Sequence, residues 1–528
     1  MLTVQATDIV FQIGVNDRMP TPSVLYPNNS DFTIDESTTI PDFFVDLNLD
    51  QVIDAITDRK QEYNLESFFY IPLQSIETIN FRQDIFRDLE NESVLNAIKK
   101  FAEKMVLVRR YLNMIEKLYF KYHQEGWFLE AAVIYCEAIQ SLVMDLKETP
   151  IKSKGLLDFL AYVNEYISSS GFISLQSDSL ERKTELSSIQ YSVIIKGNWV
   201  RVRKFESEID YSKEVERTFE KFKQGEVKNY RIDLVVASGM NHVEAQIVDC
   251  VAKLYPDFFK QLDLFCQKYS GFIDKVILTF DCQIQFFVSY IDFIENFKSK
   301  GLLFCYPRVT KDKAIHAKDT FDIALAKKRL YESEPVVCND FYLRGEERIL
   351  VVSGPNQGGK TTFARMFGQL HYLASLGCPI PGKEATLFLF DQIFTHFEKE
   401  EDIRNLRGKL QDDLVRIHRI LETATSDSII IMNEIFTSTT LKDAIFLSKE
   451  IIQRIINLDA LAVCVTFIDE LSTLGKQTVS MVSTVVPENP TQRTFKIIRL
   501  PADGLSYAIC IAEKHNLTYH LIKERIQQ

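Results

Sequence analysis

The stretch that decides the fold reads Ile349-Leu350-Val351-Val352-Ser353-Gly354-Pro355-Asn356-Gln357-Gly358-Gly359-Lys360-Thr361-Thr362. Its four apolar residues predict a short buried strand, and the glycines that follow predict a tight loop leading into a helix. Glycines let successive backbone N–H groups turn inward, and the helix N-terminus adds partial positive charge. The spacing Gly354-x-x-x-x-Gly359-Lys360-Thr361 therefore predicts a phosphate-binding loop (P-loop) for ATP.

The side chains around this loop suggest how ATP and Mg²⁺ would be held. Lys360 can reach the β- and γ-phosphates, and the Thr361 hydroxyl can hold Mg²⁺. A second apolar run, 428–432, ends in Asn433-Glu434, where P-loop ATPases normally carry Asp-Glu. Asn433 can still accept a hydrogen bond from a metal-bound water, and Glu434 can act as a general base. We predict Lys360 and Glu434 as catalytic residues, Thr361 and Asn433 (through water) for magnesium, and, for the nucleotide, Gly354, Pro355, Asn356, Gln357, Gly358, Gly359, Lys360, Thr361 and Thr362.

Working outward, the sequence divides into a C-terminal α/β part and a helical part before it. From about residue 331, short apolar runs such as 349–352, 429–432 and 461–465 alternate with amphipathic segments. This pattern predicts a mostly parallel sheet with covering helices. Residues 40–330 are mainly helical in pattern, and a heptad seam from Val94 to Tyr119 predicts one long helix packed lengthwise on others. Aromatic residues between 243 and 300 also recur at helical spacing and predict a helix-bundle core.

A segment with the alternating pattern of β-strands interrupts the helical part. Residues 188–203 alternate apolar and polar side chains around Lys196-Gly197-Asn198, which predicts a β-hairpin. Residues 196–231 contain ten basic and seven acidic side chains, a local sum of +3 in a chain of −12. Taken alone, this segment is better explained as a solvated charged face than as a nucleic-acid contact.

Several short motifs together resemble the MutS family. The P-loop matches the family's loop except at Gln357, where the family has Met. Asn339-Asp340 resembles the strand entry beside the adenine, so Asn339 joins the predicted nucleotide-binding residues. Further matches follow in the family's order: Ile393-Phe394-Thr395 at the signature loop, Glu434 with Thr439-Thr440, and the closing stretch 503–512.

The resemblance implies an ATP-driven dimer, here a homodimer, whose levers and clamps close around DNA. It implies an α/β P-loop ATPase domain of the ABC/MutS type after a mainly α-helical core/lever region with a small β-containing clamp insertion. The DNA contacts would come from the clamp, at Lys196, Arg201, Arg203 and Lys204. The expected segments are a small N-terminal piece (1–36), the helical core/lever (37–169), the clamp-like insertion (170–235), the returning lever helices (236–330) and the ATPase domain (331–528).

Three departures from the family's pattern modify this expectation. The sequence starts close to the core region, so no mismatch-recognition domain is expected. Phe467 stands where the family has a switch histidine, and Gly408, between Arg407 and Lys409, stands at the signature serine. The phenyl ring of Phe467 and the neutral amide of Asn433 replace polar or charged catalytic partners of the family. We therefore expect slow ATP hydrolysis and a long-lived ATP-bound state. Recognition of DNA would rest on its shape or branching.

Composition excludes some classes of protein and leaves alternatives open. A net charge of −12 excludes a general nucleic-acid coat. Nine cysteines without a CxxC pair predict free thiols in a reducing compartment, and neither a signal peptide nor a long apolar run is evident, so we expect a cytoplasmic protein that makes no membrane contact. Two alternatives to the DNA-repair clamp are a nucleotide-gated protein scaffold that does not bind DNA and a P-loop kinase with a small substrate.

Overall fold

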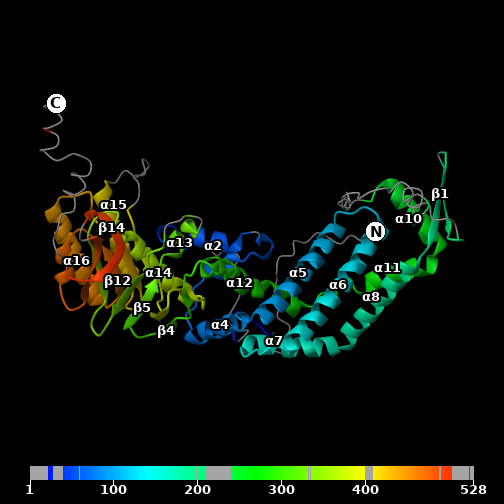
Figure 1. Cartoon of the computed structure of the whole chain (residues 1–528), viewed down its shortest axis with the longest axis horizontal. Coiled ribbons are helices and arrows are strands. Elements are labelled where there is room, and N and C mark those ends of the chain that lie inside the picture. The colour runs from blue at the N-terminus through cyan, green and yellow to red at the C-terminus, as the bar shows by residue number, and fades with distance from the viewer. Residues whose placement is uncertain are drawn as a thin grey trace, which may run out of the picture. The chain divides into compact units, whose positions relative to one another are not determined.

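The computed structural model describes residues 22–27, 40–58, 60–197, 199–207, 214, 240–330, 332, 335–398, 408–486, 489–501 and 523 (Figure 1). The chain forms two compact units. Unit 1 comprises residues 1–88, 152–156 and 282–528, and unit 2 comprises residues 89–151 and 157–281. The five segments expected from the sequence stay predictions, because the two units are defined by internal contacts and not by those boundaries.

The centre of unit 1 is a six-stranded sheet in the order β10-β11-β12-β7-β13-β14. Its strands are β7 (Ile349–Ser353), β10 (Ile393–His396), β11 (Ile429–Asn433), β12 (Leu461–Val465), β13 (Thr478–Val486) and β14 (Asn489–Arg499). The first five run parallel, and β14 is antiparallel to β13 at the edge. The mostly parallel sheet predicted from the apolar runs is therefore confirmed.

Alternate residues of these strands pack on opposite faces of the sheet, as the two-residue period of a strand requires. On one face, Val351, Ile430 and Cys464 pack with α16 (Leu441–Leu458) and α15 (Lys409–Thr423) in one apolar cluster. On the other face, Ile431 lies against Gly368 of α14 (Lys360–Ser375), where an added Cβ would come within 2.7 Å of the Ile431 Cδ1 atom. Figure 1 shows β12 between α16 and α14. The 3₁₀ helix η3 (Asp469–Thr473) follows β12.

Two smaller sheets and a short helix complete the C-terminal part of unit 1. The first sheet has the order β4-β9-β5-β6, with β4 Arg308–Thr310, β5 Ile315–Thr320, β6 Asn339–Leu343 and β9 Glu384–Phe388. The second pairs β3 (Phe304–Cys305) with β8 (Ile380–Pro381). Helix α13 (Ile323–Arg329) begins at Asp322, whose carboxylate accepts hydrogen bonds from the backbone of Ala324 and Leu325.

The N-terminal helices of unit 1 pack on this α/β part around one buried cation. They are α1 (Phe43–Asp46), α2 (Leu49–Thr57), η2 (Gln61–Tyr63), α3 (Glu66–Tyr70) and α4 (Ile76–Leu89). Arg82 on α4 is fully buried and donates to the backbone oxygens of Leu25 and Leu376, at 3.1 Å each. Its guanidinium also lies over the rings of Tyr26 and Phe286. Arg82 thus joins three distant segments, and burial lowers its pKa.

We expect Arg82→Met to destabilise unit 1 by about 3 kcal/mol, because the two carbonyl oxygens would stay buried without their charged donor. The variant should lower the midpoint of urea unfolding followed by circular dichroism. The matched control is Arg87→Met on the same helix, whose side chain is 47% exposed and pairs with Asp84. Equal midpoints for the two variants would contradict the assignment of Arg82 as a stabilising centre.

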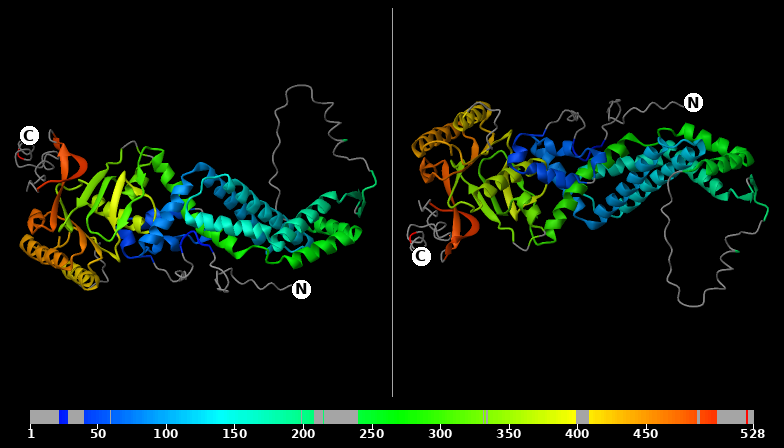
Figure 2. Two further views of the ribbon diagram at one scale, coloured as in Figure 1. Left: turned by 90° about the horizontal axis from the view of Figure 1, so that it is seen from below. Right: turned by 90° about the horizontal axis from the view of Figure 1, so that it is seen from above.

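Unit 2 is a helical bundle that carries a hairpin. Its helices are α5 (Glu92–Ile115), α6 (Lys121–Lys147), most of α7 (Lys154–Ser168), α8 (Ser170–Ser188), α10 (His242–Leu254), α11 (Pro256–Lys268) and the start of α12 (Lys275–Lys298). Strands β1 (Tyr191–Lys196) and β2 (Trp199–Lys204) pair antiparallel, with Lys196 opposite Trp199, which confirms the predicted hairpin. The neighbours α5 and α6 lie side by side in all views (Figures 1 and 2).

The predicted heptad helix is confirmed over most of its length and wrong at its end. Val94, Ile98 and Met105 are buried, but α5 stops at Ile115, and Tyr119 lies beyond it with 94% of its surface exposed. The apolar spacing in the sequence continues past residue 115, but the helix does not. The chain turns at residues 116–117 before α6 begins. The predicted aromatic core is confirmed, with Phe159 and Phe280 stacked at 3.4 Å between centroids in unit 2.

Helices α6 and α12 are long and apolar enough to cross a membrane by length and composition, although the sequence predicted no such run. However, 56% and 67% of the residues in their most apolar windows are buried inside the protein. Core helices pass the same test, and burial of this extent is typical of them.

Candidate functional site

The loop predicted as a P-loop joins β7 to α14 in a conformation that depends on its glycines. Gly354 and Gly359 have φ angles of 112° and 91°, in the left-handed region that favours glycine. Gly358 is required by space, because an added Cβ would lie 2.2 Å from the Ser483 hydroxyl oxygen. That hydroxyl donates a 2.7 Å hydrogen bond to the Gly358 carbonyl, so β13 supports the loop from behind.

Lys360 is folded back into the loop that it follows. Its ammonium nitrogen donates to the carbonyl oxygens of Gly354 and Pro355 at 2.9 and 3.2 Å, and to the Asn356 side chain at 3.4 Å. The residue is 4% exposed, and burial lowers its pKa while the charge of Glu434 opposes that shift. The Phe467 ring covers the ammonium group, with 4.5 Å between the nitrogen and the ring centroid.

The residues predicted for magnesium and catalysis lie at the same edge of the sheet. Strands β7, β12 and β11 are neighbours, so their carboxyl ends meet beside the P-loop. The Thr361 hydroxyl donates to the Asn433 side-chain oxygen at 2.9 Å, which brings the two predicted magnesium residues together. Glu434 follows with a φ of 54°, and burial raises the pKa of its carboxyl group.

A pocket of about 290 Å³ opens beside the loop. Of the predicted nucleotide-binding residues, Asn339 and the run 356–362 line it, and Glu434 does so as well; Gly354 and Pro355 contact Lys360 instead. Sequence reasoning missed its other walls, which are Leu325, Arg329, Val337 and Phe495. Val337 is close to the Asn339 motif in sequence, but the other three come from α13 and β14 and carry no local signal.

Asn339 is engaged by the edge strand. Its side chain donates to the Phe495 carbonyl at 3.2 Å and accepts from the Ile497 backbone N–H at 2.7 Å. Phe495 has a φ of 58° and lies 3.8 Å from the position that a Cβ on Gly359 would take. Asn339 therefore holds Phe495 against the P-loop.

The region resembling the signature loop is described at its two ends. Thr395 lies on β10 and donates to the Asp46 carboxylate at 2.6 Å. Gly408 is the residue before α15, and Lys409 forms an ion pair with Glu398, which also accepts from Thr437. Residues 399–407, including Arg407, and the predicted closing stretch 503–512 lie outside the described residues.

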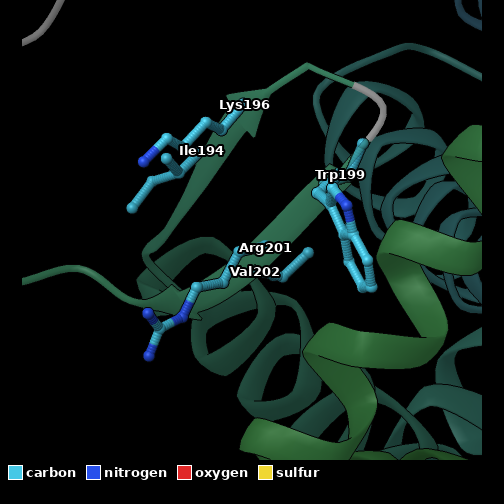
Figure 3. Close-up of a pocket in the computed structure, with 6 residues that line it drawn as sticks. Ile194, Lys196, Trp199, Arg201 and Val202 are labelled. Carbon is cyan, nitrogen blue, oxygen red and sulfur yellow. The ribbon is translucent and has the colours of Figure 1, made fainter.

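The four predicted DNA contacts are all on the hairpin of unit 2. Arg203 forms an ion pair with Glu206 at 3.7 Å, and the Lys204 ammonium lies over the Tyr255 ring. Lys196 and Arg201 line a hollow with Trp199 (Figure 3). The other basic residues predicted for this segment, from Lys213 to Arg231, lie outside the described residues.

The side chains present fit a nucleotide with bound Mg²⁺. Within the described ranges no group of three or more His, Cys, Asp or Glu side chains could hold a metal by itself. Mg²⁺ is commonly bound through few protein ligands together with substrate phosphates. The paired oxygens of Thr361 and Asn433 suit that mode.

Comparison with known proteins adds to these observations. Residues 350–528 match the model of MutS domain V. The chain is 31% identical over 243 residues to the DNA mismatch repair protein MutS of Listeria welshimeri, covering 45% of this chain and 28% of that protein. It is 27% identical over 246 residues to MutS of Halalkalibacterium halodurans (46% and 28%) and 24% identical over 278 residues to the DNA mismatch repair protein MSH3 of Eremothecium gossypii (51% and 26%).

The chain thus spans only about a quarter of the length of the relatives that it matches. The match nevertheless covers the P-loop from Leu350 onward, the strand that ends in Asn433 and the edge strand β14. These elements supply part of the pocket described above, whereas Leu325, Arg329, Val337 and Asn339 precede the matched residues. Residues 350–528 are therefore similar to domain V of the MutS family.

Proposed function

We propose that this protein is an ATP- and DNA-binding ATPase, a nucleotide-switched dimeric clamp that acts in the cytoplasm on mismatched, branched or otherwise structured DNA during repair or recombination. The observation that carries the proposal is the convergence of Lys360, Thr361, Asn433 and Glu434 at one edge of the sheet. The relatives named as DNA mismatch repair proteins support the choice of DNA as ligand.

ATP binding at this site would exchange the hydrogen-bond acceptors of Lys360. Lys360 would leave the carbonyl oxygens of Gly354 and Pro355 and donate to the β- and γ-phosphate oxygens, which are better acceptors because they are charged. Thr361 and Asn433 would hold Mg²⁺, which neutralises charge developing on the transferred phosphoryl group. Leu325, Val337 and Phe495 give the pocket an apolar side, which suits the base.

In this proposal Glu434 would accept a proton from the attacking water. Its carboxyl group is half-buried near Lys360, and the backbone N–H of Glu434 donates to Val465 at 2.9 Å, which fixes the residue after β11. A carboxylate in this position increases the nucleophilicity of water by removing its proton as the bond to phosphorus forms.

Phe467 should slow this hydrolysis. The ring packs on Lys360 and offers no hydrogen bond to water, so we expect turnover below about 10 s⁻¹, the median for enzymes. Phe467→His should raise kcat by about tenfold or more, since an imidazole can orient the attacking water. Phosphate release under saturating ATP measures the effect. Phe467→Ala separates the two explanations: an equal gain in that variant would show that the ring blocks the site rather than that a polar group is missing.

The test of the proposed function combines DNA binding with ATP hydrolysis. Protein of known oligomeric state is mixed with duplex, mismatched and four-way-junction DNA at about 100 mM salt, with and without ATP. We expect binding that weakens as salt increases and changes with nucleotide, and hydrolysis that changes with DNA. If the protein binds ATP but none of these DNAs, the result would favour the alternative of a nucleotide-gated protein scaffold. The net charge of −12 is consistent with that alternative.

A further inference from the structure

The β1–β2 hairpin of unit 2 exposes large apolar side chains at its end. We call residues 194–196 and 199–202 the hairpin tip. Trp199 is 80% exposed and Ile195 is 72% exposed. Every described residue of the two strands is exposed or half-buried. Burial on folding therefore does not explain these side chains, and contiguous apolar exposure of this kind marks interaction sites.

The same hairpin is strongly cationic. Residues 191–204 contain four basic side chains and no carboxylate, in a chain whose net charge is −12. Arg203 and Lys204 have neighbours in Glu206 and Tyr255. Within the described part of the chain, the side chains of Lys196 and Arg201 make neither an ion pair nor a hydrogen bond, so their charges are available to an anionic ligand. The surface is complementary to phosphate.

The side chains of the hairpin tip point in different directions. Ile194 pairs with Arg201 across the strands, and Lys196 pairs with Trp199 next to the turn. In Figure 3, Lys196, Ile194 and Arg201 project to one side, whereas the Trp199 ring points away from them. The indole thus stands at the end of a narrow two-stranded projection and has cations close on the same strands.

Phosphate contacts alone would need only the cations. An exposed indole adds a flat apolar face, and in nucleic acids only a base that has left its stack offers a matching face. Aromatic side chains beside basic ones are the usual means of binding single-stranded nucleic acid, and apolar wedges enter the steps of distorted duplexes.

We propose that the hairpin tip binds unpaired nucleotides, with Trp199 stacking on a base and Lys196 and Arg201 contacting the adjacent phosphates. This inference rests on the proposed function, since it requires that the protein bind DNA. It narrows the ligand to DNA with at least one unstacked base: a mismatch, a loop, a junction or a single strand.

The test uses the full chain and three fluorescently labelled probes of equal length: a perfect duplex, the same duplex with a central unpaired loop, and its single strand. Trp199→Ala should weaken binding to the looped and single-stranded probes by about 5- to 150-fold, the range for loss of one base–aromatic stack, and should leave duplex affinity nearly unchanged. Trp199→Tyr should restore most of the loss. Tyr119→Ala is the matched control, because Tyr119 is an aromatic residue of the same unit, 94% exposed and outside the hairpin.

Two further variants test the cations. Lys196→Ala and Arg201→Ala should each weaken binding to all three probes and reduce the salt slope by about one. Direct stacking can be observed in a Trp127→Phe background, in which Trp199 is the remaining tryptophan; its fluorescence should fall when the single strand is added.

The outcomes separate this inference from the function on which it rests. If no probe binds, the proposed function fails and this inference fails with it. If all probes bind and Trp199→Ala affects none of them, or affects them equally, DNA binding stands and base stacking is wrong. If Trp199→Ala leaves DNA affinity intact but abolishes self-association in sedimentation experiments, the hairpin tip is a protein interface and the inference is overturned.

Discussion

Lys360→Ala is expected to lower ATP affinity by at least about 100-fold, because it removes a cation that would donate to two phosphate groups, and each charge-assisted hydrogen bond contributes about 1.5–3 kcal/mol. The magnitude follows from the environment of the ammonium group. Lys360 is 4% exposed, so its interactions are not screened as those of a surface lysine are. Titration with a fluorescent ATP analogue in the presence of Mg²⁺ measures the affinity.

The contacts that Lys360 makes within the loop also affect how this variant is interpreted. Lys360 also satisfies the carbonyl oxygens of Gly354 and Pro355, so its removal exposes those oxygens to water or leaves them without a donor. Lys360→Met keeps most of the side-chain volume and should lose ATP to the same extent. Lys383→Ala, an exposed lysine of the same unit, is the control. If both Lys360 variants fold and bind ATP as tightly as the unchanged protein, the pocket is not a nucleotide site.

Glu434→Gln should lower the rate of hydrolysis by about 10²–10⁴-fold, the usual contribution of a general base, while ATP binding is retained. The amide keeps the size of the side chain and removes its capacity to accept a proton. Single-turnover hydrolysis and ATP titration on the same preparation separate the two effects. Glu470→Gln is the matched control, because Glu470 pairs with Lys449 at the surface. Equal rates for both variants would show that Glu434 is not the base.

The pH dependence follows from the same residue. Burial raises the pKa of Glu434, and Lys360 opposes that shift. The carboxylate is the active form, so hydrolysis should be lost as pH falls, and at a higher pH than an ordinary glutamate would show. Glu434→Gln should remove this acidic limb from the pH–rate profile. A limb that persists unchanged in the variant would assign the titration to another group.

Much of the α/β fold could be predicted because its signals are local. Parallel strands buried on both faces appear as unbroken apolar runs, such as Ile429–Met432, and the glycines after Val352 mark the turn into a helix. The hairpin was predicted for a similar reason, since its period of two and its Gly197 turn are contiguous. The sequence pattern of each of these elements is contained within the element and does not depend on contacts with distant residues.

The parts that could not be predicted depend on contacts between distant segments. The heptad spacing continued to Tyr119 although α5 had ended, because periodicity shows which side chains share a face and not where a helix stops. Arg82 could not be identified as a buried centre, since its acceptors are carbonyl oxygens of Leu25 and Leu376. Likewise Phe495 reaches the pocket only through the order of the sheet, which places β14 beside β13.

The support that β13 gives to the P-loop links two positions far apart in the gene. Gly354 and Gly358 both face Ser483, with the nearest Ser483 atoms 2.8 and 2.2 Å from the positions that their Cβ atoms would take. A larger residue at 358 therefore requires a smaller one at 483, and a larger residue at 483 displaces the loop. The two codons cannot drift independently, and in lineages related to this chain we expect changes at one to be accompanied by changes at the other.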